Sequence, residues 1–251
     1  MNTQNPQKPI DRLPPNGFPT GFRALVIGAS GAIGAAMVAQ LRADPACSAV
    51  VALHRRSQPA IDFEREDSIA AAAAELAAQA PFHLIVNAAG LLHADAGNGT
   101  DGFMPEKKLG DIEMAQMLDT FRVNTFGPAL LLRHFSRLLD RQRGVLALLS
   151  AKVGSIEDNR LGGWYSYRAS KAALNMFIKT AAIELKRSQP QAVVVALHPG
   201  TVNSRLSMPF RGAEIGRSPE VAAAEMLAVL AGLAPGDSGQ FVAYDGQRLP
   251  W

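Results

Sequence analysis

The sequence of 251 residues contains one cysteine, Cys47. A single thiol can form neither an intrachain disulfide nor a multi-cysteine zinc site, so the composition is typical of a protein of the reducing cytoplasm. The five histidines show no spacing typical of metal ligands, and no metal site is predicted. An α/β domain of this length buries enough apolar surface to fold without such cross-links.

Long apolar runs and clusters of one charge are also absent from the sequence. No run reaches the ~18 residues needed to span a bilayer. The N-terminus lacks the apolar core of a secretory signal, so neither membrane insertion nor secretion is predicted. The formal net charge is +3, but the 25 lysines and arginines are scattered along the chain. A nucleic-acid partner is therefore not expected.

The first twenty residues differ in composition from the rest of the chain. Five prolines stand among polar neighbours in residues 1–20, which predicts a flexible tail with little apolar surface to bury. No comparable boundary occurs later. Residues 21–251 are therefore predicted to form a single domain.

Short apolar segments alternate with longer amphipathic ones in this domain. The predicted strands cover residues 22–27, 49–53, 82–86, 144–149, 192–197 and 240–243, with a further short strand around Ala60. The predicted helices cover residues 33–42, 64–79, 112–139, 164–187 and 219–233. Continuous apolar strands separated by helices indicate βαβ units. The fold class predicted is α/β: a Rossmann fold with a doubly wound parallel sheet of about seven strands and helices on both faces.

A glycine-rich segment follows the first predicted strand and opens the first helix. Gly28 permits a tight turn, Gly31 lets the backbone approach a pyrophosphate, and Gly34 lets the helix pack close to the strand. Backbone groups of Ser30 and Ile33 belong to the same loop. Free N–H groups and the helix dipole favour an anion there, although an ordinary βα turn is the alternative. The segment predicts a dinucleotide site.

The end of the second predicted strand indicates which dinucleotide binds. An acidic residue that would bind the ribose hydroxyls of NAD is absent, and Arg55 and Arg56 stand there instead. Guanidinium groups suit a 2′-phosphate, so NADP(H) is favoured over NAD(H), although both arginines can equally be solvated surface. Asp62 is assigned either to the adenine or to the cap of the next helix.

Tyr167 and Lys171 stand four residues apart in a predicted helix, and therefore on one face. The ammonium group is expected to lower the pKa of the phenol and make it a proton donor or acceptor. Ser150 ends a predicted strand at the edge where ligands bind in open α/β sheets. Its hydroxyl is expected to hold a substrate carbonyl oxygen beside Tyr167, unless it merely caps a turn.

With these motifs the chain resembles the short-chain dehydrogenase/reductase family, in its C-factor-like branch related to sniffer-type carbonyl reductases. The resemblance extends from about Phe22 to the C-terminus. It adds Asn124, which in the family anchors a water in the proton relay, and it gives Tyr167 and Lys171 a further role at the nicotinamide ribose. The family's adenosine-side motif corresponds to Asn87, Ala88, Ala89 and Gly90, and its carboxamide-binding segment to Pro199, Gly200, Thr201 and Val202. The chain departs from the family at Ile27, where threonine is usual, and at Ala32, where glycine is usual.

The resemblance implies hydride transfer between a nicotinamide and a small carbonyl or alcohol substrate, in a homodimer or homotetramer. Loops 91–104, 154–164 and 201–217 are expected to surround the substrate. Trp164, Tyr165, Met208 and Phe210 are candidates for its apolar wall, and Arg205 or Arg211 for attracting an acidic group. The alternatives are a non-catalytic, cofactor-binding signalling or regulatory protein, and an epimerase or dehydratase.

Overall fold

A computed structural model describes residues 17–96 and 102–251 of the chain. Its sheet contains the six strands β1 (Phe22–Ile27), β2 (Cys47–Leu53), β3 (Leu84–Asn87), β4 (Val145–Leu149), β5 (Val193–His198) and β6 (Phe241–Ala243). They are all parallel and lie in the order β2-β1-β3-β4-β5-β6. The doubly wound parallel sheet is confirmed, with six strands in the described residues rather than about seven.

The strand predicted around Ala60 is wrong. The chain leaves β2 and turns back on itself, with the Ser57 Oγ within hydrogen-bond distance of the carbonyl oxygens of His54 and Pro59, at 2.8 and 2.6 Å. The Ile61 N–H donates to the His54 carbonyl at 3.2 Å. Backbone groups that a strand would offer to the sheet are used within this turn.

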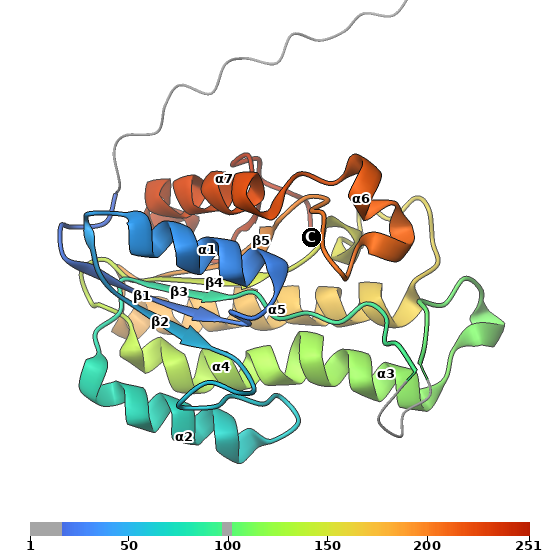
Figure 1. Cartoon of the computed structure of the whole chain (residues 1–251), viewed down its shortest axis with the longest axis horizontal. Helices are drawn as coiled ribbons and strands as arrows, with labels where there is room; N and C mark the ends of the chain where they lie inside the picture. Colours follow the sequence, from blue (N-terminus) through green and yellow to red (C-terminus); the bar gives the residue numbers. More distant parts are fainter. Residues whose placement is uncertain (1–16, 97–101) are drawn as a thin grey trace, which may run out of the picture.

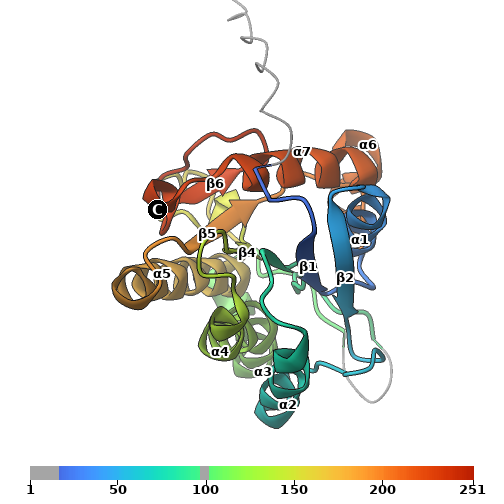
Figure 2. The same ribbon diagram turned by 90° about the vertical axis from the view of Figure 1, so that its left-hand side faces the viewer.

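Two layers of helices enclose the sheet (Figure 1; Figure 2). The longer helices are α1 (Ala32–Ala43), α2 (Glu66–Leu76), α3 (Met114–Phe121), α4 (Gly127–Phe135), α5 (Tyr165–Ser188) and α7 (Pro219–Gly232), and α6 (Gly212–Ile215) is short. Helices α1 and α7 cover one face, and α2, α4 and α5 cover the other. None of the helices in residues 17–96 and 102–251 is long and apolar enough to cross a membrane.

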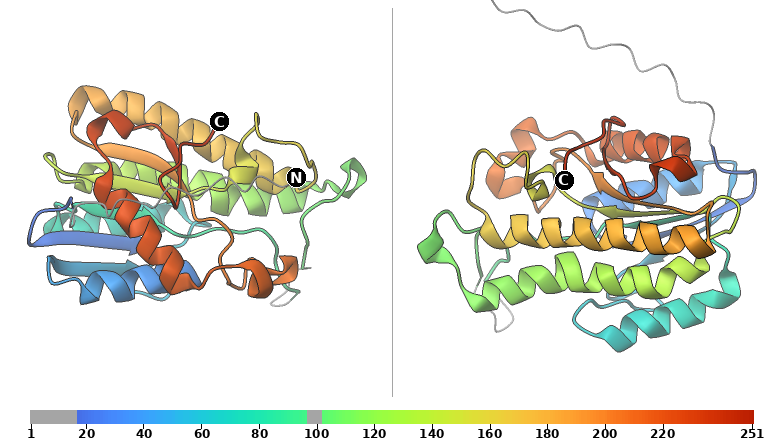
Figure 3. Two further views of the ribbon diagram at one scale, coloured as in Figure 1. Left: turned by 90° about the horizontal axis from the view of Figure 1, so that it is seen from above. Right: turned by 180° about the vertical axis from the view of Figure 1, so that it is seen from behind.

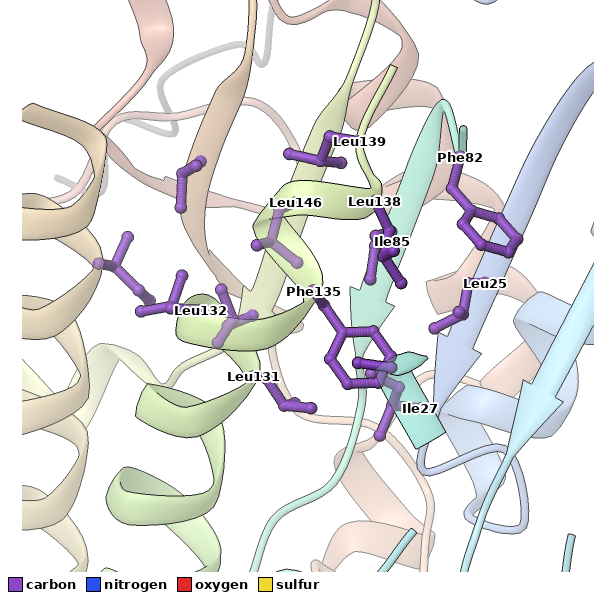
Figure 4. Packing of buried hydrophobic residues seen from close by; sticks show 14 of the residues in the cluster. Leu25, Ile27, Phe82, Ile85, Leu131, Leu132, Phe135, Leu138, Leu139 and Leu146 are labelled. Atoms are coloured by element: carbon purple, nitrogen blue, oxygen red, sulfur yellow. The ribbon is translucent and has the colours of Figure 1, made fainter. Parts of the chain in front are cut away.

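Each face of the sheet has its own apolar core. Leu25, Ile85 and Leu146 point toward Leu131 and Phe135 of α4 (Figure 4). The alternate residues of the same strands pack against α1 and α7. All five residues of β4 are buried, as expected for a central strand covered on both sides. The two cores hold the carboxyl ends of the strands at one edge.

The helix predicted over residues 112–139 is interrupted. A π-helical turn, Arg122–Phe126, separates α3 from α4, and the two helices run beside α5 (Figure 3, right). Single π-turns inside helices are frequent at functional sites. The turn contains Asn124, one of the predicted site residues.

Both described ends of the chain pack on the domain. Phe18 is buried and stacks on Phe22, with ring centroids 5.1 Å apart, so the flexible tail predicted for residues 1–20 is wrong for this residue. Residues 1–16 lie outside the described part. At the other end, Trp251 stacks on Phe241 at 5.7 Å, and its carbonyl accepts from the Ser155 hydroxyl at 3.0 Å. The C-terminus therefore docks on its own domain.

Candidate active site

The glycine segment forms the turn between β1 and α1. Gly28 has a φ of +80°, and a Cβ there would lie 2.6 Å from the Ala89 nitrogen. A Cβ on Gly34 would collide with the carbonyl of Gly28. These two positions require glycine because two backbone segments approach each other more closely than a side chain allows.

The N-terminus of α1 carries no side-chain cap. Gly31 is its N-cap residue, and no side chain bonds to the first turn. Ser30 and Gly31 are exposed, whereas Ile33 packs against the core. Two positions of this segment depart from the family pattern. Ile27 is buried in β1, and Ala32 is the first residue of α1. An exposed, uncapped helix N-terminus offers free N–H groups and a positive dipole end to an anion.

The cationic pair predicted at the end of β2 lies near this turn. The Gly28 and Ala29 nitrogens both donate to the carbonyl of Leu53, the last residue of β2. Arg55 and Arg56, which follow Leu53 closely, are exposed. Asp62 instead closes a local turn, because its carboxylate accepts from the Glu64 nitrogen at 3.1 Å; it is not the N-cap of α2, which is Arg65.

The segment after β3 faces α5 and the π-helical turn. Asn87 and Ala89 are linked through the Asn87 side chain, which accepts from the Ala89 N–H at 3.2 Å. Ala88 bonds to the end of β1, with its N–H on the Ile27 carbonyl at 2.8 Å. A Cβ on Gly90 would lie 3.7 Å from Asn124 Oδ1 and 3.8 Å from Lys171 Nζ. The exposed Gly90 thus borders two predicted catalytic side chains.

Asn124 connects three segments of the site. Its Oδ1 accepts from the Leu91 N–H at 2.8 Å, and its Nδ2 donates to the Leu91 carbonyl at 2.7 Å and to Ser170 Oγ at 3.1 Å. Ser170 Oγ in turn donates to the Tyr167 carbonyl at 2.8 Å. The side chain therefore fixes the chain after β3 against α5. Its role as a water anchor stays a prediction.

The segment after β5 turns through Gly200, whose φ is +69°. Thr201 is exposed at the turn, whereas Val202 is buried. Arg217 stabilises this turn. Its guanidinium donates to the Pro199 carbonyl and lies 3.4 Å from the centroid of the Tyr244 ring. Pro199–Val202 is thus held at the same sheet edge as the other predicted segments.

Tyr167 and Lys171 lie on the buried face of α5, as predicted. Lys171 Nζ donates to the carbonyl of Leu149, the last residue of β4, at 2.9 Å and lies 5.8 Å from the centroid of the Tyr167 ring. Both residues are almost fully buried: Lys171 is 3% exposed and Tyr167 is 8% exposed. The pair therefore occupies the carboxyl end of the central strand.

Burial governs the proton affinity of this pair. It raises the pKa of Tyr167 well above its ordinary value and lowers the pKa of Lys171 to about 7, because desolvation disfavours each charged form. The prediction that Lys171 lowers the pKa of Tyr167 is wrong. Burial of the phenol has the larger effect and raises this pKa. Tyr167 is held protonated, the state of a proton donor.

Ser150 does not lie where the sequence predicts it. Its Oγ donates to Asn175 Oδ1 of α5 at 2.6 Å, and the residue is 3% exposed. The residue that shares a buried cluster with Tyr167 and Leu92 is Ala151. The prediction assumed that the last strand residue faces the ligand, but the pleat of β4 turns Ser150 toward α5.

An apolar wall adjoins Tyr167. Trp164 lies edge-on to Tyr167 and packs on Phe210, with ring centroids 6.2 and 4.8 Å apart. Tyr165 and Met208 are wrong candidates for this wall: Tyr165 lines a separate cavity of about 240 Å³ with Val153 and Arg168, and Met208 is 61% exposed. The predicted Trp164 and Phe210 do meet beside Tyr167.

The two arginines expected to attract an acidic substrate already have partners. Arg205 pairs with Asp95, and Arg211 pairs with Glu214 at 2.7 Å. The His93 ring lies against Phe210, and its Nε2 is 3.1 Å from the Arg205 carbonyl. These contacts join the loops after β3 and β5 over the wall. The remainder of the first loop, residues 97–101, lies outside the described part.

Sequence reasoning missed Glu106. This carboxyl group is 2% exposed and accepts from the N–H of Ser166, in the first turn of α5, at 3.2 Å, and from its hydroxyl. The Glu106 carbonyl accepts from the Trp164 N–H at 2.5 Å. Trp164 has a left-handed φ of 54°, so Glu106 holds an unusual helix start. No local signal identifies it, since its partner is 60 residues away.

Within the described ranges, no group of three or more histidine, cysteine, aspartate or glutamate side chains is placed to hold a metal ion. The polar groups at the sheet edge are instead backbone amides, the Tyr167 phenol, the Lys171 amine, the amides of Asn87 and Asn124, and exposed arginines after β2. This set suits binding of an anionic organic molecule and transfer of a proton.

Comparison with known proteins supports this arrangement. The family model described as short chain dehydrogenase matches residues 23–214. The chain is 39% identical to C-signal of Myxococcus xanthus over 148 residues, which are 57% of this chain and 83% of the relative. It is 31% identical to 1-hydroxy-2-glutathionyl-2-methyl-3-butene dehydrogenase of Rhodococcus sp. over 194 residues, 77% of this chain and 80% of the relative.

Solved structures share the fold. A carbonyl reductase with bound NADPH from chicken fatty liver superposes with a TM-score of 0.78 at 24% identity, covering 96% of this chain and 98% of that one. Carbonyl reductase Sniffer of D. melanogaster superposes with a TM-score of 0.76 at 21% identity, covering 92% and 100%. With the family model covering most of the domain, the chain belongs to the short-chain dehydrogenase/reductase family and is an oxidoreductase.

Proposed function

We propose that the protein is an NADP(H)-dependent carbonyl reductase, which can also run as an alcohol dehydrogenase, for a small-molecule substrate. The observation that carries the proposal is the buried pair Tyr167 and Lys171 at the carboxyl end of β4, beside an apolar wall. A protonated phenol in a water-poor pocket is a suitable general acid for a developing alkoxide.

The residues at the sheet edge fit a dinucleotide. The uncapped N-terminus of α1, with Gly28, Ser30, Gly31, Ile33 and Gly34, would hold the pyrophosphate. Arg55 and Arg56 would hold a 2′-phosphate, with Asp62 near the adenine. The segment Asn87, Ala88, Ala89 and Gly90 would lie along the adenosine side. Tyr167 and Lys171 would meet the nicotinamide ribose, and Pro199, Gly200, Thr201 and Val202 the carboxamide.

The neighbours with bound cofactor support this assignment. Both the chicken fatty liver carbonyl reductase and a Burkholderia multivorans short-chain dehydrogenase/reductase are described with NADPH or NADP bound. In the proposed site the preference for NADP over NAD rests on the two exposed arginines after β2.

The chemistry divides between the bound cofactor and the chain. When bound, the reduced nicotinamide supplies a hydride to the carbonyl carbon. The Tyr167 hydroxyl donates its proton to the carbonyl oxygen, and solvent returns a proton to the phenolate. Lys171 stabilises that phenolate when protonated, and Asn124 keeps the segment after β3 against α5.

Replacing Tyr167 by Phe tests the proposal. The Tyr167→Phe variant is expected to lose turnover of a panel of aldehydes, ketones and quinones by at least about 100-fold, while NADPH still binds, as measured by quenching of the tryptophan fluorescence. Tyr165→Phe, on the same helix but lining the separate cavity, is the matched control and should keep its activity. Retained turnover in Tyr167→Phe would contradict the proposal.

A non-catalytic signalling or regulatory role is the second candidate, favoured by the similarity to C-signal. The two candidates differ in what Tyr167→Phe changes. A signalling protein that only binds the cofactor keeps its effect in a cell that carries this variant, whereas a reductase loses it. The homodimer or homotetramer and the cytoplasmic location stay predictions, which light scattering and fractionation can check.

A further inference from the structure

The side chains that can polarise a carbonyl oxygen beside Tyr167 are fewer than the sequence predicts. Ser150 still bonds to β5 through its backbone, with its N–H on the Leu197 carbonyl at 2.8 Å. The pleat of β4 therefore continues through this residue. Leu146 and Leu148 point into the core beneath α4 and α5, and Ser150 follows them on the same face. Its hydroxyl is bonded to Asn175, two helical turns beyond Tyr167.

Ala151 takes the place opposite Tyr167. It follows Ser150 in extended conformation, so its side chain points the other way, and it is 8% exposed in one cluster with Leu92 and Tyr167. A methyl group can fill this position but cannot donate a hydrogen bond. The neighbours Val153, Leu206 and Phe210 are equally without donors on their side chains.

Two side chains with N–H groups lie close to Tyr167 in the described residues. The Lys171 ammonium already donates to the Leu149 carbonyl at 2.9 Å, and the other group is the Trp164 indole. The two rings are T-shaped, with an interplanar angle of 78°. Trp164 also packs on Phe210, so its ring surface forms part of the apolar wall. The pocket thus combines one hydroxyl donor with aromatic and aliphatic surface.

We propose that the carbonyl oxygen is held by a single side-chain donor, the Tyr167 hydroxyl, with Ala151 in the position of a second donor, and that the substrates are therefore electron-poor aromatic aldehydes. This inference rests on the proposed function. Each donor aimed at a developing oxyanion contributes about 100-fold or more to the rate. With one donor, the substrate itself has to supply the electrophilic carbon, and the aromatic wall favours a flat apolar ring.

The test compares a substrate series in four proteins: the wild type, Ala151→Ser, Ser150→Ala and Trp164→Phe. With NADPH fixed, kcat/KM is measured in each for para-substituted benzaldehydes from methoxy to nitro and for acetophenone. Thermal melting with and without NADPH confirms that each variant is folded and binds cofactor. Ala151→Ser adds a hydroxyl donor beside Tyr167, whereas Ser150→Ala removes the hydroxyl bonded to Asn175.

The wild type is expected to show a steep rise in kcat/KM from methoxy to nitro and little activity on acetophenone. Ala151→Ser should raise kcat/KM for acetophenone and methoxybenzaldehyde by about tenfold or more and flatten the series. Ser150→Ala should leave the slope of the series unchanged. If it fails to fold, the Ala151→Ser result decides alone.

Three results would overturn the inference while the proposed function stands. The first is a flat series in the wild type. The second is an Ala151→Ser protein that binds NADPH but gains nothing on acetophenone. The third is a loss of about 100-fold in Trp164→Phe with the slope made steeper, which would assign the second donor to the indole. Absence of carbonyl turnover in every protein, with NADPH bound, would instead overturn the proposed function and this inference with it.

Discussion

The turn between β1 and α1 is built from backbone, whereas the start of α5 is assembled from side chains of distant segments. In the first region, Gly28 and Gly34 let the chain pass close to the segment after β3 and to its own turn. In the second, Glu106, Trp164 and Tyr167 meet through contacts that span up to 60 residues. The first region depends on the absence of side chains and the second on particular side chains. Substitutions in the first should therefore impair NADPH binding, and substitutions in the second should lower kcat.

The largest effect is expected at Gly34, which tests the backbone region. A Cβ there would collide with the Gly28 carbonyl, so the turn must move. Gly34→Ala should lower the free energy of unfolding by about 3 kcal/mol and abolish measurable NADPH binding by calorimetry. Gly110→Ala, where a Cβ meets nothing within 4 Å, is the control. Normal binding in Gly34→Ala would break the comparison.

A smaller effect is expected at Glu106, which tests the side-chain region. Glu106→Ala leaves the buried N–H and hydroxyl of Ser166 without their acceptor, so urea unfolding should show a loss of about 2 kcal/mol. Because the start of α5 is released, kcat should fall while NADPH affinity is kept. Glu106→Gln retains an acceptor oxygen and should recover part of both losses.

Glu113→Ala, at an exposed position with no side-chain cap bond, is the matched control for Glu106. Equal unfolding free energies for Glu106→Ala and Glu113→Ala would mean that the buried carboxyl does not hold the helix start. A loss of NADPH affinity in Glu106→Ala as large as that in Gly34→Ala would remove the distinction between the two regions.

The smallest effect is expected at Arg55 and Arg56, which are side chains next to the turn between β1 and α1. Their replacement tests whether side chains add to cofactor binding there. Replacing both by alanine should weaken NADPH binding about tenfold, or ~1.4 kcal/mol, and leave NADH binding unchanged. The reason is that exposed arginines act on the 2′-phosphate alone. Arg42→Ala, exposed at the last turn of α1, is the control. An equal change for both cofactors would assign the two arginines to general surface charge.

Prediction from the sequence succeeds where local spacing decides the result. Tyr167 and Lys171 share a face because i and i+4 always do on a helix, and Gly28 and Gly34 sit at a strand–helix turn that their spacing indicates. The alternation of apolar segments indicates the doubly wound sheet for the same reason. The predicted third strand around Ala60 fails because Ser57 closes a turn that no periodicity shows.

The sequence by itself therefore determined the fold class, the glycine turn and the tyrosine–lysine pair, since these follow from short-range geometry. The tertiary structure decided which side of β4 Ser150 faces, that Ala151 lies beside Tyr167, and that Glu106 holds the start of α5. It also decided the balance of proton affinities, because desolvation depends on every segment packed around Tyr167 and Lys171. Those properties arise from contacts between residues far apart in the chain, and no local pattern encodes them.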